Sequence, residues 1–180
     1  MRSRSVETRR CWWLVVVLAF IHVDSARAEA PNLAKQVLIL YETTRTSQLV
    51  VVSDREIPAI LGSGSSEGVD YYAEFVDQNR FGQRDYQLAF RDFLVSKYHG
   101  KRFDLLIATN ILVYYDVFEQ SLALSNVERM LRPGGLLLSN NALLELPVSR
   151  MHSIGYETVV YSDKASDGDH IVWYQRAAGK

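Results

Sequence analysis

The chain has 180 residues, of which 48% are hydrophobic and 23% charged, so it has room for one globular domain with a real core. The first 28 residues hold five of its 20 Lys and Arg but only two of its 21 Asp and Glu, so the remainder is acidic overall. That balance argues against nucleic acid and an anionic membrane surface as partners, since both require a concentrated basic face. We therefore expect a small-molecule partner, and no feature of the sequence indicates a particular oligomeric state.

The first 28 residues are typical of an export signal. A basic stretch, residues 1–10, precedes an apolar run over residues 11–23, and Ala26 and Ala28 frame a small-residue cleavage site. The run is shorter than the roughly 17 to 25 residues that span a bilayer. We predict export to the periplasm of a bacterium with cleavage near Ala28. An uncleaved anchor and a misassigned start codon, which would leave the protein in the cytoplasm, are the alternatives.

Three elements are predicted between residues 34 and 76. Residues 37–40 form a continuous apolar run, typical of a strand buried on both faces. Residues 47–61 have the apolar spacing of a helix with a kink at Pro58, and residues 69–76 are rich in strand-forming aromatic and β-branched residues. The glycine-rich residues 62–68 follow a helix and precede a strand, the reverse of a phosphate loop. We interpret them as a flexible connection, with a cofactor loop as the alternative.

The next two elements lead to the strand around which the sheet is expected to form. Asp85 is predicted to cap a helix that runs to Tyr98 and buries an aromatic stripe including Phe90 and Phe93. Residues 103–108 are apolar without alternation, which predicts a central strand. An open α/β sheet places its ligand crevice where such a strand ends, here at Thr109 and Asn110.

The last third of the chain completes the predicted sheet. Residues 117–131 form a helix expected to bury Phe118 and Val127, R-P-G-G over residues 132–135 ends it, and residues 136–140 are the next strand. Residues 151–163 and 169–176 are predicted to pair as a hairpin. The fold class is therefore α/β: a three-layer Rossmann-like sheet, mostly parallel with a C-terminal antiparallel hairpin, in one domain over residues 29–180.

No metal site is predicted from the sequence. The one cysteine, Cys11, lies in the predicted signal segment, so residues 29–180 contain neither a disulfide nor a cysteine ligand. His99, His152 and His170 have no second ligand at helical or alternating spacing. The acidic residues that flank Gly168 lack the other loop ligands of a calcium site, so we interpret them as a turn.

The first half of the domain resembles a family of binding proteins. The segments K-Q-V-L-I-L-Y, S-D-R-E-I-P-A-I-L, V-D-Y-Y-A-E-F-V-D-Q-N-R-F and Y-Q-L-A-F-R-D-F-L-V-S-K-Y-H-G-K-R-F-D-L-L-I-A are similar to the first lobe of bacterial periplasmic substrate-binding proteins and of related sensor domains. The resemblance covers about residues 34–108. It implies a ligand-binding module, although such proteins close a second lobe over the ligand and the sequence contains no recognisable second lobe.

The second half resembles another family. Four segments are similar, in their order along the chain, to the C-terminal half of class I S-adenosylmethionine-dependent methyltransferases. They are F-D-L-L-I-A-T-N-I-L-V-Y-Y-D, M-L-R-P-G-G-L-L-L-S-N-N, G-Y-E-T-V-V-Y-S-D and D-H-I-V-W-Y-Q-R. The resemblance covers about residues 103–176. It implies S-adenosylmethionine as cofactor, with Asn110, Ile111 and Tyr114 beside its methionine part, and with Tyr115 and Asp116 facing the methyl acceptor.

The cofactor loop of that family is the main departure. The family holds the cofactor through a glycine-rich loop after the first strand, whereas this chain has Y-E-T-T-R-T over residues 41–46, without glycine. Backbone without glycine approaches a ligand less closely. Glu42 in this loop is the candidate cofactor contact, and Asp77 or Glu74, at the end of the second strand, is the ribose acceptor that the resemblance implies.

Both resemblances contain F-D-L-L-I-A, which leads to the hypothesis of a fusion seam near residues 103–110 that joins equivalent strands of one sheet. Three functions remain open: a methyltransferase, a periplasmic ligand-binding or sensor module, and a fused remnant without any chemistry. Fold analogy alone does not choose among them.

Overall fold

The computed structural model describes residues 34–77, 80–140, 142–160, 162–164 and 167–178, apart from the side chains of Gln87 and Tyr114. The predicted export signal and its cleavage site lie outside these ranges. Among the described residues, no helix has the length and hydropathy needed to cross a membrane.

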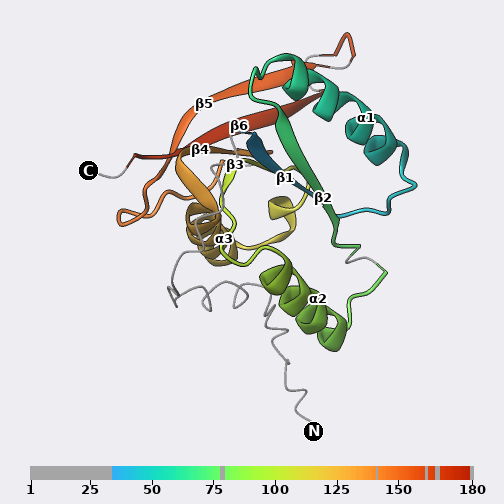
Figure 1. The fold of residues 1–180 in the computed structure, drawn as a ribbon, viewed down its shortest axis with the longest axis vertical. Coiled ribbons are helices and arrows are strands. Elements are labelled where there is room, and N and C mark those ends of the chain that lie inside the picture. Colours follow the sequence, from blue (N-terminus) through green and yellow to red (C-terminus); the bar gives the residue numbers. More distant parts are fainter. Residues whose placement is uncertain (1–33, 78–79, 141, 161, 165–166, 179–180) are drawn as a thin grey trace, which may run out of the picture.

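The described chain forms one six-stranded sheet in the order β2-β1-β3-β4-β6-β5 (Figure 1). Neighbouring strands from β2 to β4 run parallel, and β6 is antiparallel to both β4 and β5. This arrangement confirms the predicted fold class. The elements are β1 (Lys35–Tyr41), α1 (Gln48–Ser63), β2 (Val69–Phe75), α2 (Arg84–Lys97), β3 (Phe103–Ala108), the short 3-10 helix η2 (Leu112–Tyr114), α3 (Val117–Met130), β4 (Leu131–Ser139), β5 (Met151–Val160) and β6 (Gly168–Arg176).

Helices pack on both faces of the sheet. On the face covered by α1, called here the α1 face, Ile39, Tyr41 and Ile107 pack with Val50 of the helix. The opposite face, called here the α2/α3 face, packs Leu38 and Leu106 against residues contributed by α2 and α3. Because successive strand residues point to opposite faces, a continuous apolar run such as β3 supplies both layers. The result is the predicted three-layer architecture, visible in Figure 1.

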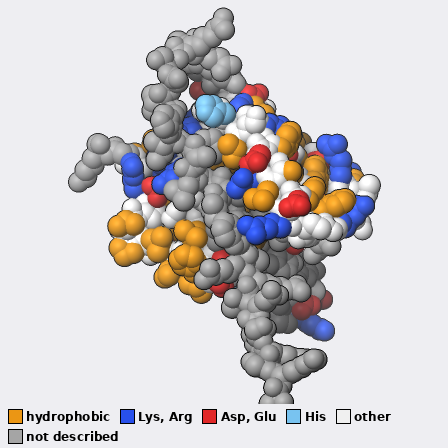
Figure 2. Space-filling view, turned by 90° about the horizontal axis from the view of Figure 1, so that it is seen from below, with side chains coloured by type: hydrophobic (Ala, Val, Ile, Leu, Met, Phe, Trp, Pro, Cys, Tyr) orange, Lys and Arg blue, Asp and Glu red, His pale blue; other side chains and the backbone are white. Residues whose placement is uncertain are grey.

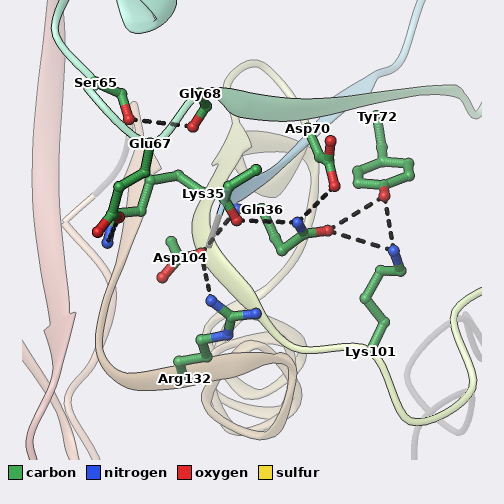
Figure 3. Close-up of polar contacts among 11 residues, drawn as sticks. Lys35, Gln36, Ser65, Glu67, Gly68, Asp70, Tyr72, Lys101, Asp104 and Arg132 are labelled. Atoms are coloured by element: carbon green, nitrogen blue, oxygen red, sulfur yellow. Dashed lines mark hydrogen bonds and ion pairs between the residues drawn. The ribbon is translucent and has the colours of Figure 1, made fainter. Parts of the chain in front are cut away.

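The sheet is tied together at its amino-terminal edge by a partly buried polar network (Figure 3). The backbone N–H of Gln36, a residue only 2% exposed, donates to Asp104 Oδ2 over 2.7 Å, and an Arg132 guanidinium N–H donates to the same oxygen over 3.0 Å. The Gln36 amide also donates to Asp70 over 2.7 Å. These bonds link β1, β2, β3 and the start of β4, and they satisfy polar groups that would be costly to bury alone.

Two predicted details of the helices are wrong. Asp85 does not cap α2: the N-cap is Gln83, two residues earlier, and Asp85 lies in the first turn, where an acidic side chain interacts favourably with the helix dipole. Phe118 is 71% exposed instead of buried. At about 100° per residue it lies roughly 120° around α3 from Leu124, which is fully buried against the sheet.

A similar rotation explains why Phe93 is 51% exposed, since it lies about 100° around α2 from Leu94, the side chain that packs on the core. The expected aromatic stripe is therefore only partly buried. In addition, β4 begins at Leu131, five residues before the predicted start. Its register against β3 shifts from the pair Phe103–Leu131 to the pair Leu105–Leu136, so R-P-G-G forms a bulge within the strand.

Charged side chains are distributed without a single dominant sign on the face shown in Figure 2. Lys and Arg alternate with Asp and Glu, and an exposed cluster of hydrophobic side chains lies beside them.

Candidate functional site

A crevice opens on the α1 face where β1, β3 and β4 end. The chain leaves β1 toward β2 on one side and leaves β3 toward β4 on the other, so the crevice lies at the switch point of the sheet. Its volume is about 630 Å³, within the range of roughly 300 to 1,000 Å³ typical of small-molecule sites. Apolar side chains of α1 form one wall, and the polar lining residues are Tyr41, Glu42, Thr43, Ser47, Ser53, Thr109, Asn110, Asn140 and Asp169.

Asn110 is the most constrained of these residues. Its φ of 59° places it in the left-handed region, which asparagine tolerates better than most residues other than glycine. Its backbone N–H donates to Asn140 Oδ1 over 2.6 Å, which joins the ends of β3 and β4. Backbone conformations of this kind concentrate at functional sites, which makes Asn110 a candidate site residue.

Two carboxylates contribute negative charge to the crevice. Glu42 follows β1 directly, and burial raises the pKa of its carboxyl above the ordinary value. Asp169 comes from the start of β6, and sequence reasoning placed it in a simple hairpin turn. Because β6 is antiparallel, it begins at the edge where the parallel strands end, which is the topological signal that would have predicted this position.

A hydrogen-bonded triangle supports the floor of the crevice. The Tyr41 and Tyr71 hydroxyls each lie 3.2 Å from Asp54 Oδ1 and 3.2 Å from one another. Burial is the main cause that raises the pKa of both phenols, so they stay protonated and can donate to the carboxylate. The triangle anchors α1 to β1 and β2 and thereby fixes one wall of the crevice.

The predicted site residues are divided between the two faces of the sheet. Glu42 and Asn110, two of the predicted cofactor contacts, line the crevice, and their contact with a cofactor stays a prediction. Ile111 and Tyr115, only slightly further along the chain, line a separate cavity on the α2/α3 face. The side chain of Tyr114 lies outside the described part of the structure.

Two further candidates, Asp116 and Asp77, are engaged in local interactions. Asp116 caps α3: its Oδ1 accepts from Glu119 N over 2.8 Å, and its own N–H donates to the Glu119 carboxylate over 3.2 Å. Asp77, with φ 44°, lies 3.4 Å from the Arg80 guanidinium. Neither aspartate lines the crevice described above.

Glu74 points to the α2/α3 face, away from the crevice. Its carboxylate lies 2.5 Å from Lys97 Nζ and accepts a hydrogen bond from the Tyr98 hydroxyl. Burial, followed by the contact with Glu74, raises the pKa of Tyr98 well above its usual range. This buried group is therefore a link between β2 and α2.

In the described part of the chain, no group of three His, Cys, Asp or Glu side chains is arranged to hold a metal ion. The chemistry available to the crevice is recognition by two carboxylates, two carboxamides and several hydroxyls over an apolar wall.

No protein-family model matches the chain, and no curated protein sequence matches it. Solved structures that resemble it include the N-methyltransferase NodS from Bradyrhizobium japonicum, with 11% identity and a TM-score of 0.42 over 80% of this chain and 86% of that chain. A methyltransferase of Methanosarcina mazei, described as S-adenosylmethionine-dependent, has 11% identity and a TM-score of 0.43 over 81% and 94% of the two chains.

A third similar structure is magnesium protoporphyrin IX methyltransferase from Synechocystis with bound S-adenosylmethionine, at 11% identity and a TM-score of 0.43 over 81% of this chain and 72% of that chain. Values this low assign neither an activity nor a ligand to the present protein. The fusion of two families stays a prediction.

Proposed function

We propose that this protein binds S-adenosylmethionine in the crevice on the α1 face and acts as a methyltransferase-like protein. The observation that carries the proposal is the position of the crevice at the switch point of the sheet, with Asn110 and Glu42 on adjacent strand ends. Open α/β sheets bind nucleotide-containing ligands at this point. The resemblance of residues 103–176 to class I methyltransferases supports the same ligand.

The charges of the crevice suit this cofactor. S-adenosylmethionine carries an ammonium and a sulfonium cation, and Glu42 and Asp169 supply carboxylates from two sides of the crevice. Asn110 and Asn140 supply amide groups, which can donate to the cofactor carboxylate or accept from ribose hydroxyls. When bound, the cofactor supplies an activated methyl group, and the role of the chain is to orient donor and acceptor.

The loop over residues 41–46 fits the cofactor less well. It contains no glycine, and Glu42 and Thr43 contribute to the crevice wall. Side chains at these positions prevent the close backbone approach that a glycine-rich loop allows. We therefore expect weak binding, and a protein that binds the cofactor without transferring its methyl group is the second outcome.

Calorimetric titration of the full chain with S-adenosylmethionine and with uncharged adenosine tests the proposal. Glu42→Gln is expected to weaken S-adenosylmethionine binding about tenfold, because it removes a charge-assisted contact, and to affect adenosine much less. Glu67→Gln, at the opposite edge of the sheet in an ion pair with Lys35, is the matched control. Absence of binding at millimolar cofactor, or an equal effect of both substitutions, would refute the proposal.

The pH dependence provides an independent check. The raised pKa of Glu42 means that burial favours its neutral form in the free protein, while a bound cation favours the charged form. S-adenosylmethionine affinity should therefore rise as the pH increases through the pKa of Glu42, and this rise should be absent in Glu42→Gln.

A further inference from the structure

A second cavity, of about 210 Å³, lies on the α2/α3 face, separated from the crevice by the sheet. Strands β1 and β3 form its floor, and α2 and α3 form its sides. Its walls are almost entirely apolar and include Leu38, Phe90, Leu94, Leu106, Ala123 and Val127. Protein interiors are close-packed, so an apolar space of this size indicates room for a ligand that the core itself does not fill.

The cavity results from the way α2 packs. Phe93, the aromatic residue beside Leu94, turns outward, and the wall on β3 and α3 includes the small side chains Ala108 and Ala123. The space extends along β3, from Phe103 at the amino end to Ala108 and Ile111 at the carboxyl end. Six strand residues span about 20 Å, so the lining residues are spread along the whole of β3.

The charged residues at the cavity have one sign. Lys101, Arg102 and Arg129 contribute to its lining, and no carboxylate is present among the described lining residues. All three lie at the amino-terminal edge of the sheet, because Lys101 and Arg102 directly precede β3 and Arg129 is in the last turn of α3 before β4. The cavity therefore combines an apolar interior with basic lining residues at its amino-terminal end.

The Lys101 ammonium is held in place by the network in Figure 3. It donates to the Tyr72 hydroxyl over 2.7 Å and to Gln36 Oε1 over 3.3 Å, and it lies 4.5 Å from the centre of the Tyr72 ring. An ammonium carries three donors, so these two bonds do not exhaust it. Lys101 also lines the cavity, so this fixed ammonium belongs to a residue at its amino-terminal end. A cation beside an apolar space suits an anionic head group on a hydrocarbon chain.

We propose that this cavity binds a free fatty acid, with the hydrocarbon chain along β3 and the carboxylate at Lys101, Arg102 and Arg129. A volume of about 210 Å³ lies below the range of roughly 300 to 1,000 Å³ of pockets for drug-sized ligands, which favours one slender chain over a ring system. Each methylene group buried in the cavity strengthens binding about fourfold.

The ligand specificity is tested on the full chain with dodecanoate, dodecanol and dodecyltrimethylammonium, each kept monomeric in solution. Displacement of the fluorescent fatty acid cis-parinaric acid measures the affinity. Dodecanoate should bind about tenfold more tightly than dodecanol, because only the carboxylate gains from three cations, and the cationic amphiphile should bind least. No saturable binding, or equal affinity for the three probes, would overturn the proposal.

Two pairs of variants test the location. Ala123→Phe fills the cavity and should abolish binding, whereas Ala89→Phe, at an exposed position of α2, should not. Combined Arg102→Glu and Arg129→Glu substitutions, which lie outside the core, should reduce dodecanoate affinity about tenfold and leave dodecanol affinity unchanged. Arg55→Glu on the opposite face of the sheet is the charge control.

Circular dichroism and urea unfolding establish that each variant is folded, and the Arg substitutions keep the test valid if Ala123→Phe is not. Unchanged dodecanoate binding in a folded Ala123→Phe variant would place the ligand elsewhere. The same conclusion would follow if Arg55→Glu reduced the affinity as much as the combined Arg102→Glu and Arg129→Glu substitutions. The combined Arg102→Glu and Arg129→Glu substitutions should leave S-adenosylmethionine binding on the other face unchanged. This result separates a failure of the fatty-acid site from a failure of the proposed function.

Discussion

Asn110 allows the backbone and the side chain of the crevice to be tested separately. Its φ of 59° disfavours every residue with a Cβ atom, by roughly 1 to 2 kcal/mol for ordinary L-residues, while glycine adopts it freely. Asn110→Ala should therefore lower the free energy of unfolding by about 1 kcal/mol relative to Asn110→Gly. The Asn110 side chain is exposed, so loss of the carboxamide itself should contribute little to stability.

The two variants should behave alike in ligand binding, since both lack the carboxamide. Urea unfolding measures the stability difference, with equal m-values required for the comparison, and calorimetry measures S-adenosylmethionine affinity. Asn126→Ala, in the cavity on the opposite face, is the matched control for the loss of an amide. Equal stability of the alanine and glycine variants would refute the left-handed backbone, and wild-type affinity in Asn110→Gly would refute a role of the carboxamide.

Three further predictions concern the scaffold. Tyr98→Phe removes a hydrogen-bond donor from a buried carboxylate and should lower the free energy of unfolding by about 1 to 3 kcal/mol. The native wild-type protein retains a phenolic proton that the unfolded chain releases above about pH 10, because the pKa of Tyr98 is raised. Urea unfolding from pH 7 to 11 should therefore show the wild-type free energy of unfolding falling above about pH 10, with a shallower fall for the variant. Asp104→Ala leaves the buried backbone N–H of Gln36 without its acceptor and should lower the free energy of unfolding by about 1 to 3 kcal/mol. The side chain of Arg132 is 39% exposed, so Arg132→Ala should lower it by less than about 1 kcal/mol. Equal losses of stability in urea unfolding would contradict this ranking. Gly134 has a φ of 81°, so Gly134→Ala should lower the melting temperature. Gly62 lies in α1, where an added Cβ would meet no atom within 4 Å, so Gly62→Ala should raise the melting temperature through a gain of about 0.5 to 1 kcal/mol in stability. The opposite order would show that backbone conformation does not decide the effect at these positions.

Local sequence patterns predicted the elements well because they report properties of single segments. The apolar run over residues 103–108 coincides with β3, and the predicted helix over residues 47–61 corresponds to α1 despite Pro58. Burial of individual side chains was predicted less well. Phe118 matched an apolar pattern, yet it lies about 120° around α3 from the buried Leu124 and therefore faces solvent.

The candidate site was predictable only in part. Asn110 was expected at a crevice because ligand crevices form at the carboxyl ends of parallel strands, and Glu42 because the resemblance to methyltransferases implies a cofactor loop after the first strand. Both residues line the crevice, and their contact with a cofactor stays a prediction. Asp169 was missed because its position depends on the antiparallel course of β6, which is a property of the whole sheet. Ile111 was expected beside Asn110, and Tyr115 was expected to face the methyl acceptor. The chain makes a left-handed turn at Asn110 and a 3-10 helix after it, and both residues line the cavity on the other face.

The sequence by itself determined the order of strands and helices, since apolar runs, helical periodicity and turn residues act over a few neighbouring positions. Only the tertiary structure decided which side chains share a cavity. The crevice and the cavity lie on opposite faces of the same strands, and alternate residues of β1 and β3 contribute to one or the other: Ile39 and Ile107 to the crevice, and Leu38 and Leu106 to the cavity. Strand geometry imposes this alternation, while the packing of α1, α2 and α3 determines where each face remains open.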